Sequence, residues 1–574
     1  MQRIEICLAL LAIAIALAYP RIGARWFRML ENGFRKLARR RRLAVLVVGV
    51  TALAARAAVL PVEPIPHPII QDEYSYLLAA DTFAHGRLTN PTHPMWVHIE
   101  AFQEIWQPTY QSKYFPGQGL ALALGQVVFG HPFWGVWLSI GLMCAALCWM
   151  LQGWMPPGWA LLGGFLAVIR LGTFSYWADT YFGGAVAAIG GALVLGALPR
   201  IKREQHVQDA LLMGLGLAIL ANTRPYEGLV LSLPVAAALL AWIAGRERPP
   251  WRVWFGTVAL PLSLTLALAA VAMGYYFWRV TGNPLRMPYQ VYTDAYGASP
   301  NLLLQHARTV FPAYHNREIR NFYVRFEASF FSLARSLHGR LLQFAALKTY
   351  ELWLFFVGPL LTLPLVMLSA VALKRHACRW RLVSPGTRFL LIASAVCLGS
   401  LLLESFFSLH YAAPMTCLFL ALVLLSLRRL RAWRWQGKPA GLFVSRAVPL
   451  IAVAMLLLRV AAVPLHLSIV GYWAFRLEVK PPTWCSPLKP EFPRARILAE
   501  LEQKPGKHLA IVRYRPDHEP SIDWVYNEAD VDASRVVWAR DRGPAENEEL
   551  IRYFKDRDVW LVEPDENPPR LSAH

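Results

Sequence analysis

Long apolar blocks without charge constrain this chain more than any other feature of its sequence. Residues 253–277 contain no lysine, arginine, aspartate or glutamate, and they lie between Arg252 and Arg279. A helix of about 20 apolar residues spans a hydrocarbon core roughly 30 Å thick. Similar blocks recur along the chain, so we expect it to cross a membrane many times.

Twelve blocks of this kind predict transmembrane helices, and one further apolar region is predicted to differ. The helices are expected near residues 4–19, 43–60, 133–151, 159–176, 181–198, 209–222, 228–245, 253–278, 352–373, 388–404, 412–427 and 446–465. Residues 116–129 are apolar but short and glycine-rich, which predicts a re-entrant or interfacial helix. The expected fold class is an all-α polytopic membrane protein with about 12 transmembrane helices.

The basic loops predict the orientation of these helices. Short cytoplasmic loops carry an excess of lysine and arginine, and residues 20–42 carry nine of them. Alternation from there places the loops 61–132 and 279–351 outside, together with the tail after about residue 466. A full span at 116–129 would place the later basic loops outside, so the charge pattern argues against it. We therefore expect a multi-pass protein of the plasma (inner) membrane with these segments extracytoplasmic.

The chain divides into three predicted parts. Residues 1–42 hold an extra helix and a basic cytoplasmic loop, and residues 43–475 form the transmembrane domain. Residues 476–574 are charged and have ordinary hydrophobicity. Periodicity in this tail predicts three strands and one amphipathic helix, at 508–514, 535–539, 559–562 and 545–556. The tail is therefore expected to form a small soluble α/β domain on the extracytoplasmic side.

The net charge of +21 points to a lipid surface when its distribution is considered. Arginines cluster between apolar blocks, as at 39–42 and 428–431. Such clusters are typical of contacts with anionic lipid head groups, so the expected partner is the lipid bilayer and not nucleic acid. The seven cysteines show no spacing typical of a disulfide framework or a metal site.

Two adjacent carboxylates, Asp72 and Glu73, follow the second predicted span. Acidic side chains near a bilayer are costly unless they are solvated, paired or functional. Residues 76–84 have apolar side chains at helical spacing, which predicts an interfacial helix that holds Asp72 near the head groups. A carboxylate there can act as general base on a hydroxyl or amine. An acid that only caps the helix is an equal alternative.

Two cations lie at the predicted outer ends of other segments. Lys113 precedes the apolar region 116–129, where an ammonium can meet a lipid phosphate. The alternative is a lysine that snorkels to the interface. Arg224 is a candidate for a phosphate, and a structural pair with Glu227 is the alternative.

Asp179 and His410 lie on the same predicted face. Asp179 is in a short aromatic-rich loop, and His410 marks the outer end of a late span, where a lone histidine is more often structural. Charges thus gather at helix ends on one side, while the bilayer centre is nearly free of them. Ion-coupled transporters instead place charges near the midplane.

The stretch from Asp72 to Gly119 resembles the first outer loop of GT-C glycosyltransferases. More narrowly, it is similar to bacterial relatives of protein O-mannosyltransferases and of the lipid A aminoarabinose transferase. The motifs that match in order are Asp72, Glu73, Gly86, Leu88, Lys113 and Pro116. Residues 113–116 read Lys-Tyr-Phe-Pro, where the family has Lys-Pro-Pro. Asp179 matches the second acid of the family, His410 to Pro414 is similar to its late aromatic-proline helix start, and the resemblance covers roughly residues 43–465.

The resemblance implies an inverting transfer of a hexosyl or pentosyl group at the outer face of the membrane. The donor would be a polyprenyl-phosphate-linked sugar, and the acceptor a protein or a glycolipid. Asp72 would deprotonate the acceptor, while Glu73 and Asp179 would position acceptor or sugar hydroxyls. The residues expected to bind the lipid phosphate and stabilise the leaving group are Lys113, Arg224 and His410.

No cofactor is certain from the sequence. The acids could hold a divalent cation, but no ligand spacing requires a metal. Two other functions fit the same residues. A transporter or flippase of lipid-linked saccharides would not need Asp72 as a base, and a non-catalytic scaffold would act through residues 476–574.

Overall fold

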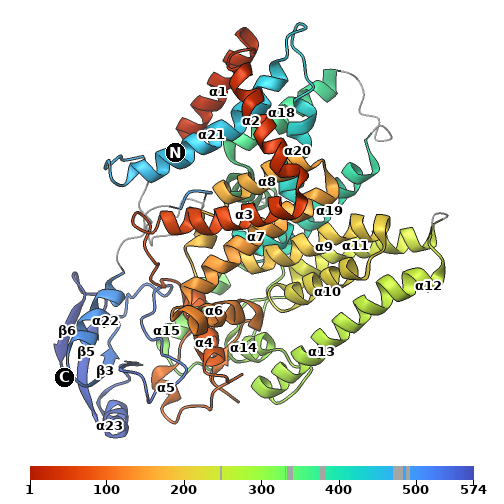
Figure 1. The fold of residues 1–574 in the computed structure, drawn as a ribbon. Helices are drawn as coiled ribbons and strands as arrows, with labels where there is room; N and C mark the ends of the chain where they lie inside the picture. The colour runs from red at the N-terminus through yellow and green to blue at the C-terminus, as the bar shows by residue number, and fades with distance from the viewer. Residues whose placement is uncertain (246–247, 330, 333–340, 375–382, 470–482, 487–491) are drawn as a thin grey trace.

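The computed structural model describes residues 1–574 apart from 246–247, 330, 333–340, 375–382, 470–482 and 487–491. A bundle of helices carries a small β-sheet domain at one end (Figure 1). Eight of the described helices are long and apolar enough to cross a membrane. The protein is therefore a multi-pass membrane protein, and the predicted fold class is confirmed.

Each of the twelve predicted spans overlaps helical residues. The shorter of these helices are α1 (Gln2–Ala18), α3 (Arg41–Ala58), α8 (Pro157–Arg170) and α10 (Val207–Ala221). The longer single helices are α7 (Phe133–Trp154), α9 (Ala185–Glu204), α11 (Pro225–Ala244), α19 (Pro385–Leu403) and α21 (Ala440–Ala462). Three spans are composite helices. The first consists of α12 (Trp251–Trp254), η2 (Phe255–Ala259) and α13 (Leu260–Thr281), and the second of α17 (Leu341–Leu352), η4 (Trp353–Val357) and α18 (Gly358–Lys374). The third consists of η6 (Leu409–Met415) and α20 (Thr416–Leu430).

The loop between α8 and α9 is longer than predicted. The predicted spans 159–176 and 181–198 are separated by residues 177–180 only. In the structure, α8 ends at Arg170 and α9 begins at Ala185. Gly183 and Gly184 have φ angles of 72° and 151°, which a right-handed helix does not allow. A single 3₁₀ turn, η1 (Tyr176–Ala178), lies in the middle of this loop. The loop carries Asp179 into the protein interior.

The basic segment 20–42 contains a helix that the sequence did not predict, α2 (Ala24–Arg39). Gly23, with a φ angle of 68°, lies at its start. Trp26, Met29 and Phe34 are exposed on this helix, and cations alternate with them in the sequence. The high density of arginine hid the helical spacing of the apolar residues, which is typical of an interfacial helix.

The first predicted outer loop holds two main helices. Its elements are α4 (Gln71–Ala84), α5 (Trp96–Ile99), β1 (Glu104–Ile105), β2 (Gln111–Ser112) and α6 (Pro116–Phe129). α4 begins earlier than predicted, so Asp72 and Glu73 lie in its first turn. The predicted helix at 116–129 is confirmed, and it ends at Gly130, whose φ angle is 77°. Its re-entrant or interfacial placement stays a prediction.

The second long loop that the sequence predicts to lie outside packs against the first. It contains α14 (Pro288–Tyr296), α15 (Arg317–Arg320) and the π-helical η3 (Asn321–Glu327). Phe102 and Ile105 share a buried aromatic cluster with Tyr292, Phe322 and Tyr323. This cluster covers one side of the β1–β2 hairpin.

The C-terminal domain has a four-stranded sheet in the order β4-β3-β5-β6. Its elements are α22 (Pro493–Gln503), β3 (Lys507–Val512), β4 (Val536–Arg540), α23 (Pro544–Tyr553), β5 (Arg557–Glu563) and β6 (Arg570–Ala573). β3 is parallel to β4 and β5, and β6 is antiparallel to β5. The three predicted strands and the predicted helix are confirmed, while β6 and α22 were missed. The predicted domain boundary at residue 476 lies outside the described residues.

The C-terminal domain, at the lower left of Figure 1, packs on the loop between α3 and α7. Ile99 and Trp106 of that loop share a buried cluster with Leu509 and Val537 of the sheet. The Arg540 Nε also donates a hydrogen bond of 2.9 Å to the carbonyl of Glu100. The loop that carries Asp72 is thus held between the bundle and the C-terminal domain.

Candidate active site

Asp72 is half-buried in the first turn of α4, and one of its oxygens is held by a tyrosine. The Tyr114 hydroxyl donates a hydrogen bond to Oδ1, and the Tyr114 ring stacks on Tyr76 with centroids 4.4 Å apart. Burial and the Asp72 charge raise the pKa of Tyr114, so the hydroxyl keeps its proton. No described residue donates a hydrogen bond to Oδ2 of Asp72, which leaves that oxygen open to accept a proton.

Lys113 is a buried cation that faces aromatic rings. Its Nζ lies 5.1, 4.8 and 4.5 Å from the ring centroids of Tyr114, Tyr289 and Tyr292. Among the residues that the structure describes, no carboxylate lies within 4.0 Å of this nitrogen and no group accepts a hydrogen bond from it. Burial lowers the pKa of Lys113 to about 8, although Asp72 opposes the shift. The ammonium therefore lacks a close anion.

Arg224 resembles Lys113 in its surroundings. It precedes α11 and lies with its guanidinium carbon 4.3 Å from the centroid of the Tyr411 ring. Its nearest acid is Glu227, at 3.8 Å from Nη1 to Oε1. Within the described chain the guanidinium donates no hydrogen bond, although an arginine offers five N–H donors. These donors are available to a planar or tetrahedral anion.

Glu404 lies beside this group and was missed by the sequence analysis. It follows α19 and is 6% exposed. In the described part of the chain, neither of its carboxyl oxygens has a hydrogen-bond partner. Burial, with a contribution from Glu227, raises the pKa of Glu404 to about 9. The carboxyl is therefore protonated at neutral pH and does not neutralise Arg224.

Glu73 ties α4 to the loop between α8 and α9. Its Oε2 accepts hydrogen bonds from the backbone N–H groups of Ile69 and Ile70, at 2.9 and 3.2 Å. Its Oε1 accepts a bond of 3.1 Å from the N–H of Tyr181. Helix capping is the alternative to a chemical role for this acidic pair, and the geometry of Glu73 is that of a cap.

Asp179 belongs to a second buried group of charges. Its Oδ1 lies 3.7 Å from Nη2 of Arg56. The Nε and Nη1 of Arg56 donate hydrogen bonds to the carbonyls of Ala178 and Glu63. The Glu63 carboxylate in turn pairs with Arg459 at 2.6 Å. The structure therefore joins Asp179 to Arg56. It also brings Lys113 close enough to Asp72 and Arg224 for their charges to act on its pKa.

His410 is buried among aromatic rings. Its Nδ1 lies 3.3 Å from the hydroxyl of Tyr176, and its ring lies 4.8 Å from that of Phe182. The neighbouring residue, Tyr411, is the one that contacts Arg224. The predicted role of His410 in phosphate binding stays a prediction, while Tyr411 joins the group of residues around Arg224.

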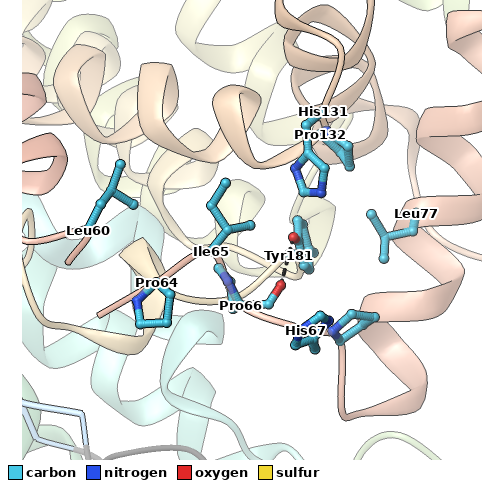
Figure 2. Close-up of a pocket in the computed structure, with 10 residues that line it drawn as sticks. Leu60, Pro64, Ile65, Pro66, His67, Leu77, His131, Pro132 and Tyr181 are labelled. Carbon is cyan, nitrogen blue, oxygen red and sulfur yellow. Dashed lines mark hydrogen bonds between the residues drawn. The ribbon is translucent and has the colours of Figure 1, made fainter. Parts of the chain in front are cut away.

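An apolar groove with a volume of about 660 Å³ lies beside α4 (Figure 2). Most of its lining comes from the segment between α3 and α4, completed by Leu77, His131, Pro132 and Tyr181. The Tyr181 hydroxyl donates a hydrogen bond of 2.9 Å to the carbonyl of Pro66 across the groove, drawn as a dashed line in Figure 2. Since the Tyr181 N–H also binds Glu73, one residue links the groove to the first turn of α4.

Comparison with known proteins finds similarity among solved structures. No family model and no curated protein matches the chain. The oligosaccharyltransferase of Archaeoglobus fulgidus, in a complex with Zn and sulfate, matches at 11% identity and a TM-score of 0.48 over 90% of this chain and 67% of that one. ArnT from Cupriavidus metallidurans matches at 13% identity and a TM-score of 0.44 over 90% and 92%. These proteins are GT-C glycosyltransferases.

This chain is similar in structure to both proteins along most of its length. A further structure of the archaeal enzyme AglB, in a complex with an inhibitory peptide and a dolichol-phosphate, matches at 12% identity and a TM-score of 0.40, over 90% of this chain and 69% of that one.

The described residues contain one group that could ligate a metal ion, and it lies apart from the predicted site residues. Glu204, His206 and Asp209 offer ligand atoms within 4.8 Å of one another at the turn between α9 and α10. Glu204 and His206 are exposed. The predicted divalent cation among the outer acids stays a prediction.

Proposed function

We propose that this protein transfers a glycosyl group from a polyprenyl-phosphate carrier to a hydroxyl or amine acceptor at the outer face of the membrane. The observation that supports it most is the position of Lys113, which has no carboxylate within 4.0 Å among the described residues, beside the open oxygen of Asp72. A buried cation without a protein partner is costly, and a phosphate would satisfy it. Arg224, which lies 3.8 Å from Glu227, has N–H donors left for the same phosphate. Asp72 supplies the base that a sugar transfer needs next to such a phosphate.

The proposed chemistry is a single displacement with inversion. Oδ2 of Asp72 takes the proton of the acceptor as the acceptor's lone pair attacks the anomeric carbon. The bond between that carbon and the phosphate oxygen breaks, and its electron pair stays on the phosphate. Lys113 and Arg224 stabilise the charge that develops there. The Tyr114 hydroxyl holds Oδ1, so the base keeps one orientation.

The groove of Figure 2 supports a lipid carrier. Its volume falls in the range of about 300–1,000 Å³ that is typical of small-molecule sites. The helix α6 exposes the apolar side chains Leu120, Leu124 and Val127. His131, which lines the groove, comes two residues after the end of this helix. A hydrocarbon chain can pass from the bilayer into the groove and bring its phosphate to the neighbouring face of α4.

Glu73 and Asp179 take supporting parts in this proposal. Glu73 fixes the start of α4 through backbone hydrogen bonds. Asp179 pairs with Arg56 and thereby holds the loop between α8 and α9. The outer location follows from the basic-loop pattern. The identity of the sugar, hexose or pentose, is left to a donor panel.

A transfer assay with purified protein in liposomes tests the proposal. A panel of radiolabelled polyprenyl-phosphate sugars is supplied with membrane extract as the acceptor source, and wild type is compared with Asp72→Asn. The matched control is Asp294→Asn, because Asp294 is an exposed acid of the second outer loop paired with Arg286. Label should leave the carrier with wild type and the control, and not with Asp72→Asn. Equal transfer by Asp72→Asn would refute the role of Asp72.

A further inference from the structure

The helix α4 presents three faces, and one of them meets the C-terminal domain. Asp72 and Tyr76 lie on the face that meets Tyr114. Glu73 and Leu77 lie on the face that meets the groove and the loop between α8 and α9. The third face follows the helical spacing of three and four residues and consists of Gln71, Tyr74, Leu78 and Asp81.

Residues 521–529 of the C-terminal domain run along this third face. At its start, the Gln71 side-chain amide donates a hydrogen bond of 3.2 Å to the carbonyl of Ser521. At its end, the N–H of Ala529 donates one of 2.9 Å to Oδ2 of Asp81. Asp81 comes ten positions after Gln71, so the two contacts are about 15 Å apart along the helix at 1.5 Å per residue. The contact therefore extends over most of α4.

A stacked pair of tyrosines forms the centre of this contact. The rings of Tyr74 and Tyr526 lie 4.0 Å apart with an angle of 3° between their planes. The buried Arg494 donates hydrogen bonds to the carbonyls of Trp524 and Tyr526, at 2.8 and 3.0 Å. Its Nη1 also reaches the Tyr74 hydroxyl at 3.4 Å. One guanidinium thus links the C-terminal segment to the residue two positions after Asp72.

We propose that Arg494 and residues 521–529 form a clamp that holds α4 in the orientation in which Asp72 meets the acceptor. The inference rests on the proposed function of Asp72. Tyr526 and Arg494 are positioning residues, since they act on Asp72 through Tyr74 and touch no reacting atom. The C-terminal domain is thereby a working part of the active site and not an independent appendage.

The physical reason is the sensitivity of proton transfer to geometry. A base must lie within about 2.6–3.2 Å of the proton it takes, and a misplacement of 1 Å can cost about a hundredfold in rate. The segment before α4 contains Pro61, Pro64, Pro66 and Pro68 and forms no helix or strand. Contacts from outside α4 must therefore set its orientation. The clamp supplies the hydrogen bonds at Gln71 and Asp81 and the stacked ring at Tyr74.

The test compares two variants of the full-length protein in liposomes, with the radiolabelled donor identified by the panel. Tyr526→Ala removes the stacked ring. Tyr526→Phe keeps the ring and removes only a hydroxyl that has no hydrogen-bond partner among the described residues. We expect Tyr526→Ala to lower kcat by about tenfold to a hundredfold with the donor KM unchanged, because Lys113 and Arg224 are on other elements. Tyr526→Phe should match wild type.

A second measurement separates positioning from simple destabilisation. Rates are normalised to folded protein, and hydrogen–deuterium exchange is followed in the peptide that covers residues 71–84. The clamp predicts faster exchange of that peptide in Tyr526→Ala and not in Tyr526→Phe. An unchanged kcat per folded molecule, or unchanged exchange of α4 in Tyr526→Ala, would overturn the clamp. If wild type transfers no sugar, the proposed function fails, and the exchange measurement still decides whether the clamp holds α4.

Discussion

Two groups of buried charge in this protein differ in how their charges are balanced. In the first, Lys113 lies against tyrosine rings with no carboxylate within 4.0 Å among the described residues, and Arg224 has Glu227 at 3.8 Å and no hydrogen bond from its guanidinium. In the second, Arg56 lies 3.7 Å from Asp179 and donates hydrogen bonds to two carbonyls, and Arg459 is hydrogen-bonded to Glu63 at 2.6 Å. Both groups lie near the ends of membrane helices, so their depth in the protein does not separate them.

The difference shows which charges are available to a ligand. A buried cation that is paired inside the protein contributes to folding, and the loss of one partner leaves an uncompensated charge. A buried cation that lacks a partner costs stability in the empty protein and gains a partner when an anion binds. The first group should therefore control activity, and the second should control stability.

The largest effect is expected from breaking the second group. Arg56→Met leaves Asp179 buried without its cation and removes hydrogen bonds to two carbonyls. We expect the free energy of unfolding to fall by about 3–5 kcal/mol, measured by titration with SDS in mixed micelles. The double variant Arg56→Met/Asp179→Asn should recover part of this loss, because neither charge then remains. An unchanged unfolding curve for Arg56→Met would contradict the comparison.

The next effect concerns the first group, where activity should change instead. Lys113→Met removes a cation that stabilises the leaving phosphate, so kcat/KM for the donor should fall by about a hundredfold to a thousandfold. The same change should leave the unfolding curve at or above that of wild type, since an unpaired buried cation is lost. The matched control is Lys555→Met, an exposed lysine on the C-terminal domain. A fall in stability without a fall in activity would reverse the two assignments.

The pH dependence sharpens the role of Lys113. Burial lowers the pKa of Lys113 to about 8, so the ammonium is charged below that pH and neutral above it. The donor kcat/KM should therefore be level up to pH 8 and fall by about tenfold per pH unit above it. Lys113→Arg should remove this decline, because an arginine stays charged throughout the range. A decline that persists in Lys113→Arg would show that another group titrates.

The sequence predicted the fold better than it predicted the contents of the site. Hydropathy and basic loops located the membrane helices because each signal lies within one segment. The same local reasoning selected Asp72, Lys113 and Arg224 as charges at helix ends. One sequence does not predict that these side chains lie close together, because residues 72, 113, 224 and 411 come from four segments that meet only in the packed fold.

The missed residues have identifiable causes. Tyr114, Tyr289 and Tyr411 lie where interfacial aromatic residues are common anchors, so they gave no distinct signal. Arg56 did carry a signal, since an arginine near the end of an apolar block usually has a partner. This signal would have predicted a cationic partner for Asp179.

The smallest effect is expected at Glu404, which lies beside the first group but does not neutralise the charge of Arg224. Burial and then Glu227 raise the pKa of Glu404 to about 9, so its carboxyl is neutral at pH 7. Glutamine has nearly the shape and polarity of that neutral acid, so Glu404→Gln should change kcat/KM at pH 7 by less than about twofold, a change worth under about 0.5 kcal/mol. Glu404→Lys, which adds a charge next to Arg224, is the contrasting variant and should impair activity. A large loss in Glu404→Gln at pH 7 would mean that an ionised Glu404 balances Arg224, and the first group would then be paired like the second.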